Sequence, residues 1–355
     1  MRIVYDNIIF TWQQSGGISV VWGHLLKRML KTSFNVTCIE YSGTERNITR
    51  KTLNIPSKLI DKRSNFAFKI RRYLNPIIKI KEPFIFHSSY FRTCHNKQAI
   101  NVTTVHDFTY ELFETNLLKK LLHCWQKHRA IRHSDCIVCV SYNTRNDLLR
   151  FLPDVDPAKI HVIYNGVDEA FRPLPDIQKK NYVLFVGQRK GYKNFESILH
   201  PLAKANLPLV IVGKPLTEKE KKKLVAVGIK YHYIGTISNQ ELNKRYNEAL
   251  CLLYPSSYEG FGLPVIEAQR AGCPVIAKEG SSITEIIGDT RLLLHHVSKE
   301  EILAKLLLLK ESKLYQDFVD KGLQNSQKYT WDLMTKGYLK LYESICKFNL
   351  ENNLI

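Results

Sequence analysis

Residues 251–268 have the sequence CLLYPSSYEGFGLPVIEA, and this stretch decides the fold class. The apolar run Cys251–Tyr254 is followed by a loop with two glycines, and Pro264 then stands where the first turn of a helix tolerates proline. A strand, a glycine-rich loop and a helix in this order are typical of a parallel sheet covered by helices. The stretch therefore predicts an α/β protein.

The same order recurs on both sides of this stretch, because short runs rich in β-branched residues alternate with amphipathic segments of helical length. This alternation predicts two doubly wound parallel sheets. The predicted strands are Ile3–Phe10, Val36–Tyr41, Phe84–His87, Val102–His106, Cys136–Ser141, Ile160–Tyr164, Tyr182–Val186, Leu209–Val212, Tyr231–Ile234, Cys251–Tyr254 and Pro274–Ala277. The predicted helices include Val20–Leu30, Leu117–Arg132, Asn239–Ala249 and Ser298–Leu309.

A length of 355 residues fits two domains of ordinary size. The sequence NGVD at 165–168 and two prolines soon after it interrupt the pattern and mark the boundary. We expect an N-terminal Rossmann-like domain over 1–165, a second one over 166–330, and a final helix over 331–355 that packs back on the first domain. Ligands of open parallel sheets bind beyond the carboxyl ends of the strands, so we expect the ligand in a cleft between the domains.

The composition limits the class of protein and of partner. With 44% hydrophobic and 24% charged residues, the chain is neither disordered nor a small disulfide scaffold, and its eight scattered cysteines fit reduced thiols. The net charge of +19 predicts an acidic partner: nucleic acid, anionic lipid or a phosphorylated ligand. Neither a run of 18 apolar residues nor a secretory signal is found, so no transmembrane helix is expected.

The loop and helix after Tyr254 carry the sharpest chemical pattern. Glu259 lies in the loop and Glu267 in the first turns of the helix, where their carboxylates can accept hydroxyls from two parts of one ligand. Gly260 and Gly262 free the backbone between them, so that its N–H groups can bind phosphate oxygens. Packing needs do not explain an acid in such a loop.

Two loops of the N-terminal half carry weaker patterns. Gly16 and Gly17 lie between the first strand and the next helix, where they either admit a phosphate or form an ordinary tight turn. His106 and Asp107 end a buried strand, where His106 either binds a sugar hydroxyl or is satisfied within the fold.

Two loops of the C-terminal half carry further candidates. In the loop 187–194, Arg189 and Lys193 can clamp a diphosphate, and a solvated basic loop is the alternative. Glu285 is either a ligand contact or the acid of a capping box that begins at Ser282.

Taken together, these motifs resemble the retaining glycosyltransferases of family 4, which have the GT-B fold of two Rossmann-like domains. The match extends over nearly the whole chain, and its most specific element is Glu259-x7-Glu267 within EGFGLPxxEA. The other matching elements follow the order of the family: Gly16-Gly17, Val105-His106-Asp107, Asn165-Gly166-Val167-Asp168, Gly187 to Asn194, and Gly235.

The resemblance implies roles for the matching residues. Gly16 and Gly17 lie against the donor phosphates, His106 contacts the transferred sugar near its 6-hydroxyl, and Glu267 binds the ribose. The implied catalytic residues are His106, Arg189, Lys193 and Glu259. The implied donor-binding residues are Gly16, Gly17, Arg189, Lys193, Gly235, Glu259, Gly260, Phe261, Gly262, Leu263 and Glu267. One departure weakens the assignment of Arg189: many family members have arginine directly after the glycine, where this chain has Gln188.

The implied reaction moves a hexose from a nucleoside-diphosphate sugar to a glycan acceptor and retains the anomeric configuration. Cations at the diphosphate take the place of a metal, so neither a metal nor a cofactor is expected. No nucleophile for a double displacement is evident, and a front-face attack is favoured. GDP-mannose is the favoured donor and a UDP-hexose the second choice. The expected acceptor is a lipid-linked glycan of bacterial O-antigen, capsule or lipopolysaccharide synthesis.

Residues 46–81 contain eleven Lys and Arg and one acid, and within them the stretch 65–74 mixes aromatic residues with cations. The segment 117–133 extends this basic patch with Lys119, Lys120, Lys127, Arg129 and Arg132. Such a surface predicts a cytoplasmic protein bound peripherally to the inner face of the plasma membrane, and a solvated basic face is the alternative.

Two other functions compete with this interpretation. A GT-B sugar-nucleotide epimerase would need no acceptor surface, so the basic N-terminal half argues against it. A nucleic-acid-binding protein would explain the charge of +19, but neither a helix-turn-helix, an RNP aromatic pair nor a zinc finger is found.

Overall fold

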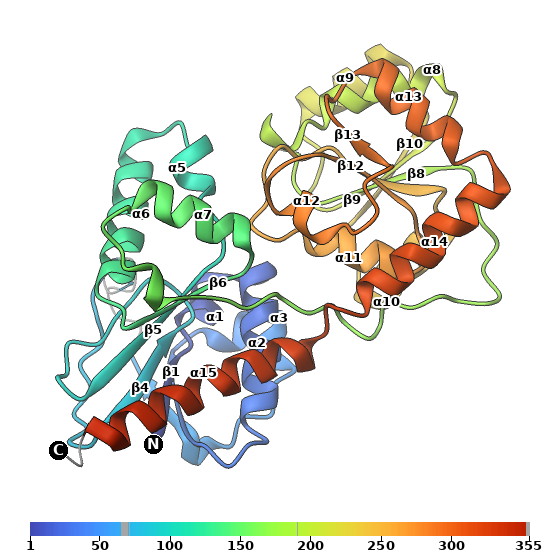
Figure 1. The fold of residues 1–355 in the computed structure, drawn as a ribbon. Helices are drawn as coiled ribbons and strands as arrows, with labels where there is room; N and C mark the ends of the chain where they lie inside the picture. Colours follow the sequence, from blue (N-terminus) through green and yellow to red (C-terminus); the bar gives the residue numbers. More distant parts are fainter. Residues whose placement is uncertain (65–69, 71, 190, 353–355) are drawn as a thin grey trace. The chain divides into compact units, whose positions relative to one another are not determined.

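The computed structural model describes residues 1–64, 70, 72–189 and 191–352. They form two compact units: an N-terminal unit of Met1–Gly166 with Trp331–Ile355, and a C-terminal unit of Val167–Thr330. The first boundary differs by one residue from the predicted one. Each unit contains one parallel sheet with helices on both faces, so the predicted α/β fold with two Rossmann-like domains is confirmed (Figure 1).

The sheet of the N-terminal unit has seven strands in the order β3-β2-β1-β4-β5-β6-β7, all parallel. Its centre is β1, where Asp6 pairs with Ile39 of β2 and with Ser88 of β4 at the carboxyl edge. The strands are β1 Arg2–Asp6, β2 Asn35–Tyr41, β3 Ile60–Arg63, β4 Phe84–Ser88, β5 Ala99–Val105, β6 Cys136–Cys139 and β7 Ile160–Val162.

Helices cover both faces of this sheet. Neighbouring residues of a strand point to opposite faces. On β5, Thr104 hydrogen-bonds Tyr338 of the last helix, whereas Thr103 accepts a hydrogen bond from Ser134, just after α6. The helices are α1 Ile8–Trp12, α2 Gly17–Met29, α3 Ile48–Lys51, α5 Thr109–Phe113, α6 Leu117–Arg132, α7 Tyr142–Phe151 and α15 Trp331–Asn352, with short 3-10 helices at Thr44–Arg46, Ser57–Leu59 and Pro157–Lys159.

The last helix, α15, packs on the sheet of the N-terminal unit through aromatic side chains. Its Tyr342 hydroxyl lies 2.7 Å from Nδ1 of the buried His87, whose Nε2 lies 2.9 Å from Thr104. Burial lowers the pKa of His87 to about 3, so this ring is neutral and serves the packing. The contacts tie residues near the end of the chain to β4 and β5.

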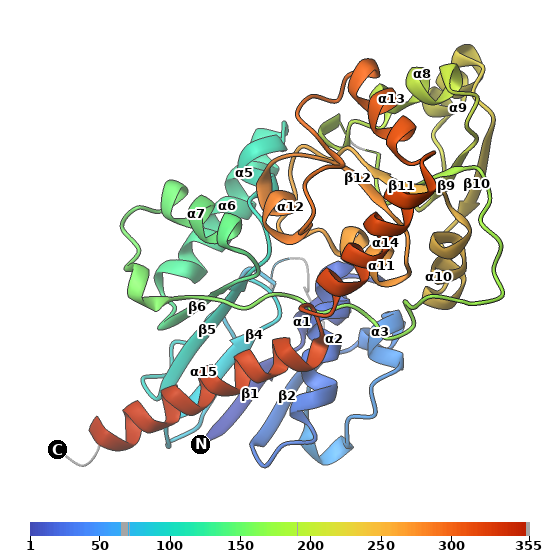
Figure 2. The same ribbon diagram turned by 45° about the vertical axis from the view of Figure 1, so that its right-hand side comes forward.

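The C-terminal unit has a six-stranded parallel sheet in the order β10-β9-β8-β11-β12-β13. In both views α8, α9 and α13 lie on one side of it, and α10, α11 and α14 lie on the other (Figure 2). The strands are β8 Val183–Val186, β9 Leu209–Val212, β10 Tyr231–Gly235, β11 Cys251–Tyr254, β12 Val275–Lys278 and β13 Leu293–Leu294. The helices are α8 Leu199–Lys204, α9 Glu218–Val227, α10 Asn239–Glu248, α11 Leu263–Arg270, α12 Ser281–Ile286, α13 Lys299–Leu308 and α14 Ser312–Ser326, with 3-10 helices at Gly191–Lys193 and Glu196–Ile198.

One predicted strand has a wrong end, and two strands were missed. The first strand ends at Asp6 rather than Phe10, because Asn7 bonds Glu40 and Trp22 and the apolar residues after it form α1. Two strands, β3 and β13, were not predicted at all. Both lie at a sheet edge, and β3 has the sequence IDKR, which carries little apolar pattern. Within the described residues, each helix is too short or too polar to span a bilayer.

Candidate functional site

Three glycines stand at the carboxyl ends of adjacent strands in the C-terminal unit. Gly187 follows β8, Gly213 follows β9 and Gly235 ends β10, and their φ angles are 123°, 142° and 90°. The Gly187 N–H donates to Val212 and the Gly213 N–H donates to Gly235. A Cβ on Gly213 would lie 2.6 Å from the Gly187 carbonyl oxygen, so only glycine fits there. This edge of the sheet therefore exposes backbone that a ligand can approach closely.

Lys193 and Glu259 meet at the same edge, on the loops that follow the paired strands β8 and β11. Their side chains form an ion pair, and each is 14% exposed, so both charges remain open to a ligand. Asn194 holds the two loops together: it adopts a positive φ of 50°, and its Nδ2 donates to the carbonyl of Pro255 at 2.9 Å. The two predicted residues are thus brought together across 66 positions of sequence.

Two serines fix the loop that carries Glu259. The Glu259 N–H donates to Ser281 Oγ at 3.0 Å, and Ser282 Oγ lies 2.9 Å from the Glu259 carbonyl and 2.8 Å from the Phe261 carbonyl. Gly262 then caps α11 with a φ of 100°, and a Cβ there would lie 2.6 Å from Ile283. The loop is therefore held from α12, with Gly260 to Leu263 forming the entry to α11.

Of the two alternatives for Glu285, the capping box that begins at Ser282 is wrong, and the ligand contact stays a prediction. Helix α12 begins at Ser281 with Gly280 as its N-cap, and the Gly280 N–H donates to Thr284 Oγ1. The hydroxyl of Ser282 is used by the Glu259 loop instead. The sequence reasoning weighed Ser282 only as a cap and missed this supporting role. The two serines after Gly280 indicate this role only weakly in the sequence, because the backbone groups they bind lie more than 20 residues away.

Glu267 lies in α11 with its carboxylate against Tyr246, whose hydroxyl donates to Oε2 at 3.1 Å. Burial raises the pKa of Glu267 to about 7, and the charge of Asp168 acts in the same direction. The group is therefore protonated in a large fraction of molecules near neutral pH. A protonated carboxyl can donate a hydrogen bond as well as accept one.

Arg189, the other predicted phosphate ligand, is turned to a different neighbour. Its Nε donates to Glu220 at 2.7 Å, and its Nη2 donates to the carbonyls of Lys214 and Pro215 at 2.8 Å. Glu220 also closes a capping box with Thr217 at the start of α9. The structure thus brings Lys193 to Glu259 and Arg189 to Glu220. The diphosphate role of Arg189 stays a prediction, and Lys190 lies outside the described residues.

Gly16 and Gly17 open helix α2 in the N-terminal unit. Gly16 is the N-cap, its carbonyl accepts from the Val20 N–H at 3.1 Å, and the Ser19 hydroxyl donates to the same oxygen at 2.8 Å. Gly17 is exposed, and a Cβ on it would meet open space. A helix N-terminus with a small exposed residue is suited to an anion.

His106 and Asp107 follow β5 in the N-terminal unit. Burial lowers the pKa of His106 to about 4, so the ring is neutral at physiological pH. Asp107 accepts from the Thr109 N–H at 2.9 Å, and its carbonyl accepts from Lys127 at 3.0 Å. The same ammonium donates to Glu111 at 2.6 Å.

Lys127 corrects one prediction. It was predicted to extend the membrane-binding basic patch into segment 117–133, but its side chain is 0% exposed and paired with the buried Glu111. Burial alone would raise the pKa of Glu111, but His128 and Lys127 outweigh it and lower the pKa to about 2. Lys127 therefore braces the loop of His106. Of the other predicted patch, residues 65–69 and 71 lie outside the described residues.

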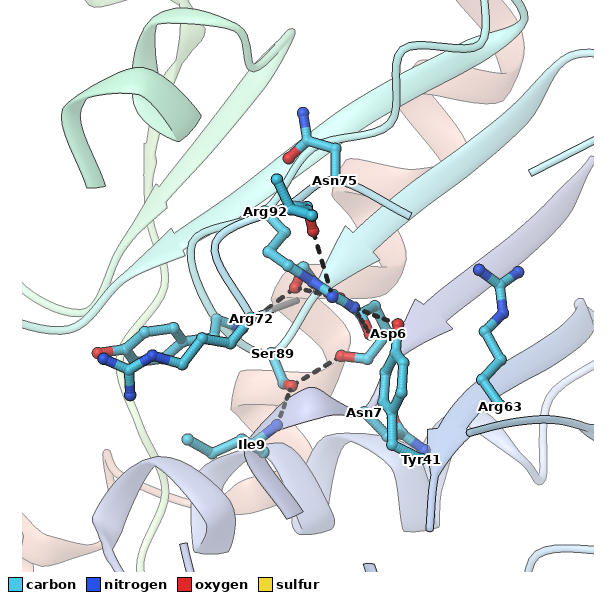
Figure 3. A network of polar contacts seen from close by, with 12 residues as sticks. Asp6, Asn7, Ile9, Tyr41, Arg63, Arg72, Asn75, Ser89 and Arg92 are labelled. Carbon is cyan, nitrogen blue, oxygen red and sulfur yellow. Dashed lines mark hydrogen bonds and ion pairs between the residues drawn. The ribbon is translucent and has the colours of Figure 1, made fainter. Parts of the chain in front are cut away.

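A buried ion pair at the end of β1 was missed by the sequence reasoning. Asp6 pairs with Arg92 at 2.6 Å, Ser88 donates to the same carboxylate at 2.8 Å, and Arg92 also donates to the Tyr41 hydroxyl (Figure 3). An acid that ends an otherwise apolar first strand was the available signal. Beside this network lies a pocket of about 280 Å³, lined by Tyr41, Arg63, Leu74, Asn75, Pro76, Ile77 and Arg92.

Among the described residues, Glu111, Cys124 and His128 have the chemistry and proximity of metal ligands, with their ligand atoms within 4.8 Å of one another. The Glu111 carboxylate already binds the buried ammonium of Lys127. A divalent cation would have to share that carboxylate with a positive charge, so this group fits a structural ion pair better than a metal.

Two family models match the chain, one for each unit. The model of glycosyl transferases group 1 matches residues 167–325, and the model of glycosyltransferase family 4 matches residues 15–171. Together the two matches extend over residues 15–325.

Curated relatives agree at low identity. The O-antigen chain mannosyltransferase B of Escherichia coli is 25% identical over 284 residues, which are 73% of this chain and 74% of the relative. The O-antigen chain mannosyltransferase RfbU of Salmonella typhimurium is 28% identical over 190 residues, about half of each chain (52% and 53%). Among solved structures, sucrose-phosphate synthase of Thermosynechococcus elongatus has a TM-score of 0.75 at 15% identity, with 98% of this chain and 100% of that chain covered.

Proposed function

From the premise that this chain belongs to glycosyltransferase family 4 and has the GT-B fold, we propose that it transfers a hexose from a nucleoside-diphosphate sugar to a glycan acceptor with retention of the anomeric configuration. The chain is a glycosyltransferase. Its donor, its acceptor and the retention of configuration are what we propose.

The observation that carries the proposal is the pair of Lys193 and Glu259 at the carboxyl edge of the C-terminal sheet. Without a donor the two charges neutralise each other. A nucleotide sugar can bind both: its diphosphate pairs with the ammonium of Lys193, and its sugar hydroxyls donate hydrogen bonds to the carboxylate of Glu259. The glycines at the ends of β8, β9 and β10 let the diphosphate and the base approach the backbone.

The difficult step is the cleavage of the bond between C1 of the sugar and the phosphate. Negative charge then grows on the leaving diphosphate, and a fixed ammonium stabilises that charge more in the transition state than in the ground state. We assign this role to Lys193, with the N–H groups of Gly16, Gly17 and the start of α11 as further donors. Arg189 joins them only if it leaves Glu220.

The remaining residues orient the donor. A neutral His106 can donate a hydrogen bond to a sugar oxygen without adding a charge beside the developing positive charge of the sugar. Glu267 takes the ribose hydroxyls, as carboxyl or carboxylate, from its place beside Tyr246. In this scheme the leaving phosphate accepts the proton of the acceptor hydroxyl, and the reaction needs no metal and no other cofactor.

We propose mannose as the sugar, because two relatives over different lengths of the chain are O-antigen chain mannosyltransferases. The donor is then GDP-mannose, with a UDP-hexose as the second candidate. The acceptor is a lipid-linked glycan of a bacterial surface polysaccharide, which places the enzyme at the cytoplasmic face of the plasma membrane.

The test is a thermal-shift series with GDP, UDP, GDP-mannose and UDP-glucose. A ligand that binds the native state raises the melting temperature, by an amount that grows with its concentration above Kd. We expect the largest shift for GDP-mannose and its loss in Lys193→Ala. Proton NMR of the glycosylated product then reports the anomeric configuration.

Each result has a separate consequence. A shift with UDP-glucose alone would correct the donor and leave the site in place. No shift with any of the four nucleotides, in a protein that still unfolds cooperatively, would refute the proposed donor site. A product of inverted configuration would refute retention.

A further inference from the structure

Helix α6 presents an apolar face to solvent. Its five large apolar residues Leu117, Leu118, Leu121, Leu122 and Trp125 are between 43% and 80% exposed. At about 100° per residue they occupy a continuous arc of about 140° on the helix. Buried residues of α6, among them Gln126, Lys127, Ala130 and Ile131, occupy the opposite side.

This arrangement is the reverse of an ordinary surface helix, in which the apolar stripe faces the core and the polar face meets water. A single exposed leucine needs no explanation, but a stripe of five does, because contiguous apolar patches on a monomer mark an interaction surface. Trp125 lies 4.6 Å below the guanidinium of Arg129, which joins the apolar stripe to a cation.

The apolar surface continues beyond α6. Gln126 donates to the carbonyl of Arg72, and Arg129 donates to the carbonyl of Tyr73 and to Asn75 Oδ1, so α6 is fastened to the segment 72–75. Leu74 of this segment and Ile77, two residues after it, are exposed as well. They line the pocket beside Arg92 and Tyr41.

The charges around the stripe select its partner. The sequence of α6 contains three lysines and two arginines and no acid; Lys127 is buried against Glu111, which leaves four cations outside the core, and the whole chain carries +19. A second copy of this chain would bring the same positive charge against the stripe. An anionic lipid surface instead offers an apolar interior for the leucines and negative headgroups for Lys119, Lys120 and the arginines.

We propose that the outer face of α6 inserts into the headgroup region of an anionic bilayer, with Leu117, Leu118, Leu121, Leu122 and Trp125 in the acyl boundary and Lys119, Lys120 and the two arginines of the helix at the phosphates. In Figures 1 and 2 the helix lies beside α5 and α7 in the N-terminal unit. The proposal deepens the membrane part of the proposed function and rests on it. It narrows the contact from the basic residues of 46–81 and 117–133 to the outer face of α6.

The test is flotation of the full chain with vesicles of phosphatidylglycerol and phosphatidylethanolamine, with phosphatidylcholine vesicles as the neutral comparison. The chain should float with the anionic vesicles, and less so at high salt. The variant Leu118→Gln with Leu121→Gln should reduce binding about tenfold or more, since each leucine loses its apolar burial. The matched control is Leu307→Gln with Val225→Gln, whose residues are 61% and 72% exposed in the C-terminal unit. It should float like the wild type.

Two further measurements sharpen the test. The variant Lys119→Gln with Lys120→Gln should weaken binding by roughly fivefold per lysine. The tryptophan emission should shift to shorter wavelength on addition of anionic vesicles, and Trp125→Phe should lose this shift while Trp12→Phe, which removes another exposed tryptophan, keeps it.

The proposal is overturned if the leucine variant floats as well as the control, or if the wild type does not float with anionic vesicles at low salt. It is also overturned if the wild type is a dimer in solution that the leucine variant dissociates, because the stripe then joins two copies. Flotation is measured without nucleotide, and nucleotide binding by thermal shift is measured without vesicles. A failure of the membrane contact is therefore distinguishable from a failure of the donor site.

Discussion

Each unit of the molecule places a lysine and a glutamate together near the carboxyl edge of its sheet, and the two pairs differ in what they leave for a ligand. Lys127 and Glu111 are buried, and the ammonium is satisfied by the carboxylate and by the Asp107 carbonyl. Lys193 and Glu259 are both partly exposed. The charges of the first pair have all their partners within the fold, whereas each charge of the second pair can exchange its partner for a ligand.

The difference follows from local structure. Lys127 extends from the long helix α6 toward the loop of His106. There its ammonium donates to Glu111 of α5 and to the carbonyl of Asp107, which precedes α5. Lys193 stands at the end of a single 3-10 turn, and Glu259 lies on a loop that two serines hold by its backbone. The backbone of that loop is fixed while its carboxylate is available. Whether an ion pair near the carboxyl edge of a sheet can bind a ligand therefore depends on how exposed its side chains are.

The sharpest way to break this comparison is to remove Lys127. Lys127→Ala leaves Glu111 buried without its main partner, which should lower the free energy of unfolding by about 3–5 kcal/mol. Urea unfolding measures the change. The control is Lys119→Ala on the exposed side of the same helix, expected within about 0.5 kcal/mol of wild type. A loss below 1 kcal/mol in Lys127→Ala would contradict the structural role of the pair.

Lys193→Ala should have the opposite profile. The rate of nucleoside-diphosphate release from the donor should fall by roughly a hundredfold, about 2.7 kcal/mol of barrier, because the leaving diphosphate loses its fixed cation. The free energy of unfolding should change less than in Lys127→Ala, because Lys193 and Glu259 are each 14% exposed whereas Lys127 is 0% exposed. Lys223→Ala, which removes an exposed ion pair with Glu196, should leave the rate unchanged. Equal rates for Lys193→Ala and wild type would end the proposed mechanism.

The positions of Lys193 and Glu259 at the sheet edge were predictable from the sequence, whereas the buried pair of Lys127 and Glu111 was not. Alternating strands and helices predicted both sheets. Lys193 and Glu259 were each predicted to contact the ligand from loops at the carboxyl ends of parallel strands, which converge, but the ion pair between them was not predicted. The buried pair was hidden, since a lysine in a run of cations has the same pattern whether it faces water or an acid on another element.

The same limit explains the other misses. Asp6 and Arg92 are 86 residues apart, and the sequence offers no rule that pairs them. The exposed leucines of α6 were visible as an amphipathic segment, but a periodic apolar stripe is ordinarily assigned to the core. Periodicity states which residues share a face, and only the packing of neighbouring elements states where that face points.

Variants of Arg189 test whether this third cation binds the donor, as proposed for Lys193, or serves only the fold, as Lys127 does. Arg189→Gln and Glu220→Gln should each lower the free energy of unfolding by about 2 kcal/mol, because each breaks a charged hydrogen bond that holds the start of α9. Donor affinity, measured by calorimetry, should be nearly equal in the two variants. If Arg189→Gln alone weakens donor binding tenfold or more, the guanidinium belongs to the diphosphate site.

Glu267 provides the mildest test, through pH. Its pKa is raised from 4.5 to about 7 in the folded protein, so the folded state holds this proton more tightly than the unfolded state does. The unfolding free energy therefore decreases as the pH rises through this interval, as the fold comes to contain a poorly solvated carboxylate. The full shift would correspond to about 3 kcal/mol, and we expect roughly 1 kcal/mol because the residue is partly exposed.

Glu267→Gln removes this titration. Between pH 4.5 and pH 7 the wild type should lose about 1 kcal/mol relative to the variant, followed by urea unfolding at each pH. Tyr246→Phe, which removes the hydroxyl that donates to Glu267, should steepen the pH dependence rather than abolish it, because that hydrogen bond lowers the pKa. Parallel stability curves for wild type and Glu267→Gln would mean that the carboxylate is solvated in the free enzyme. Glu267 would then enter the ribose site already charged, as an acceptor alone.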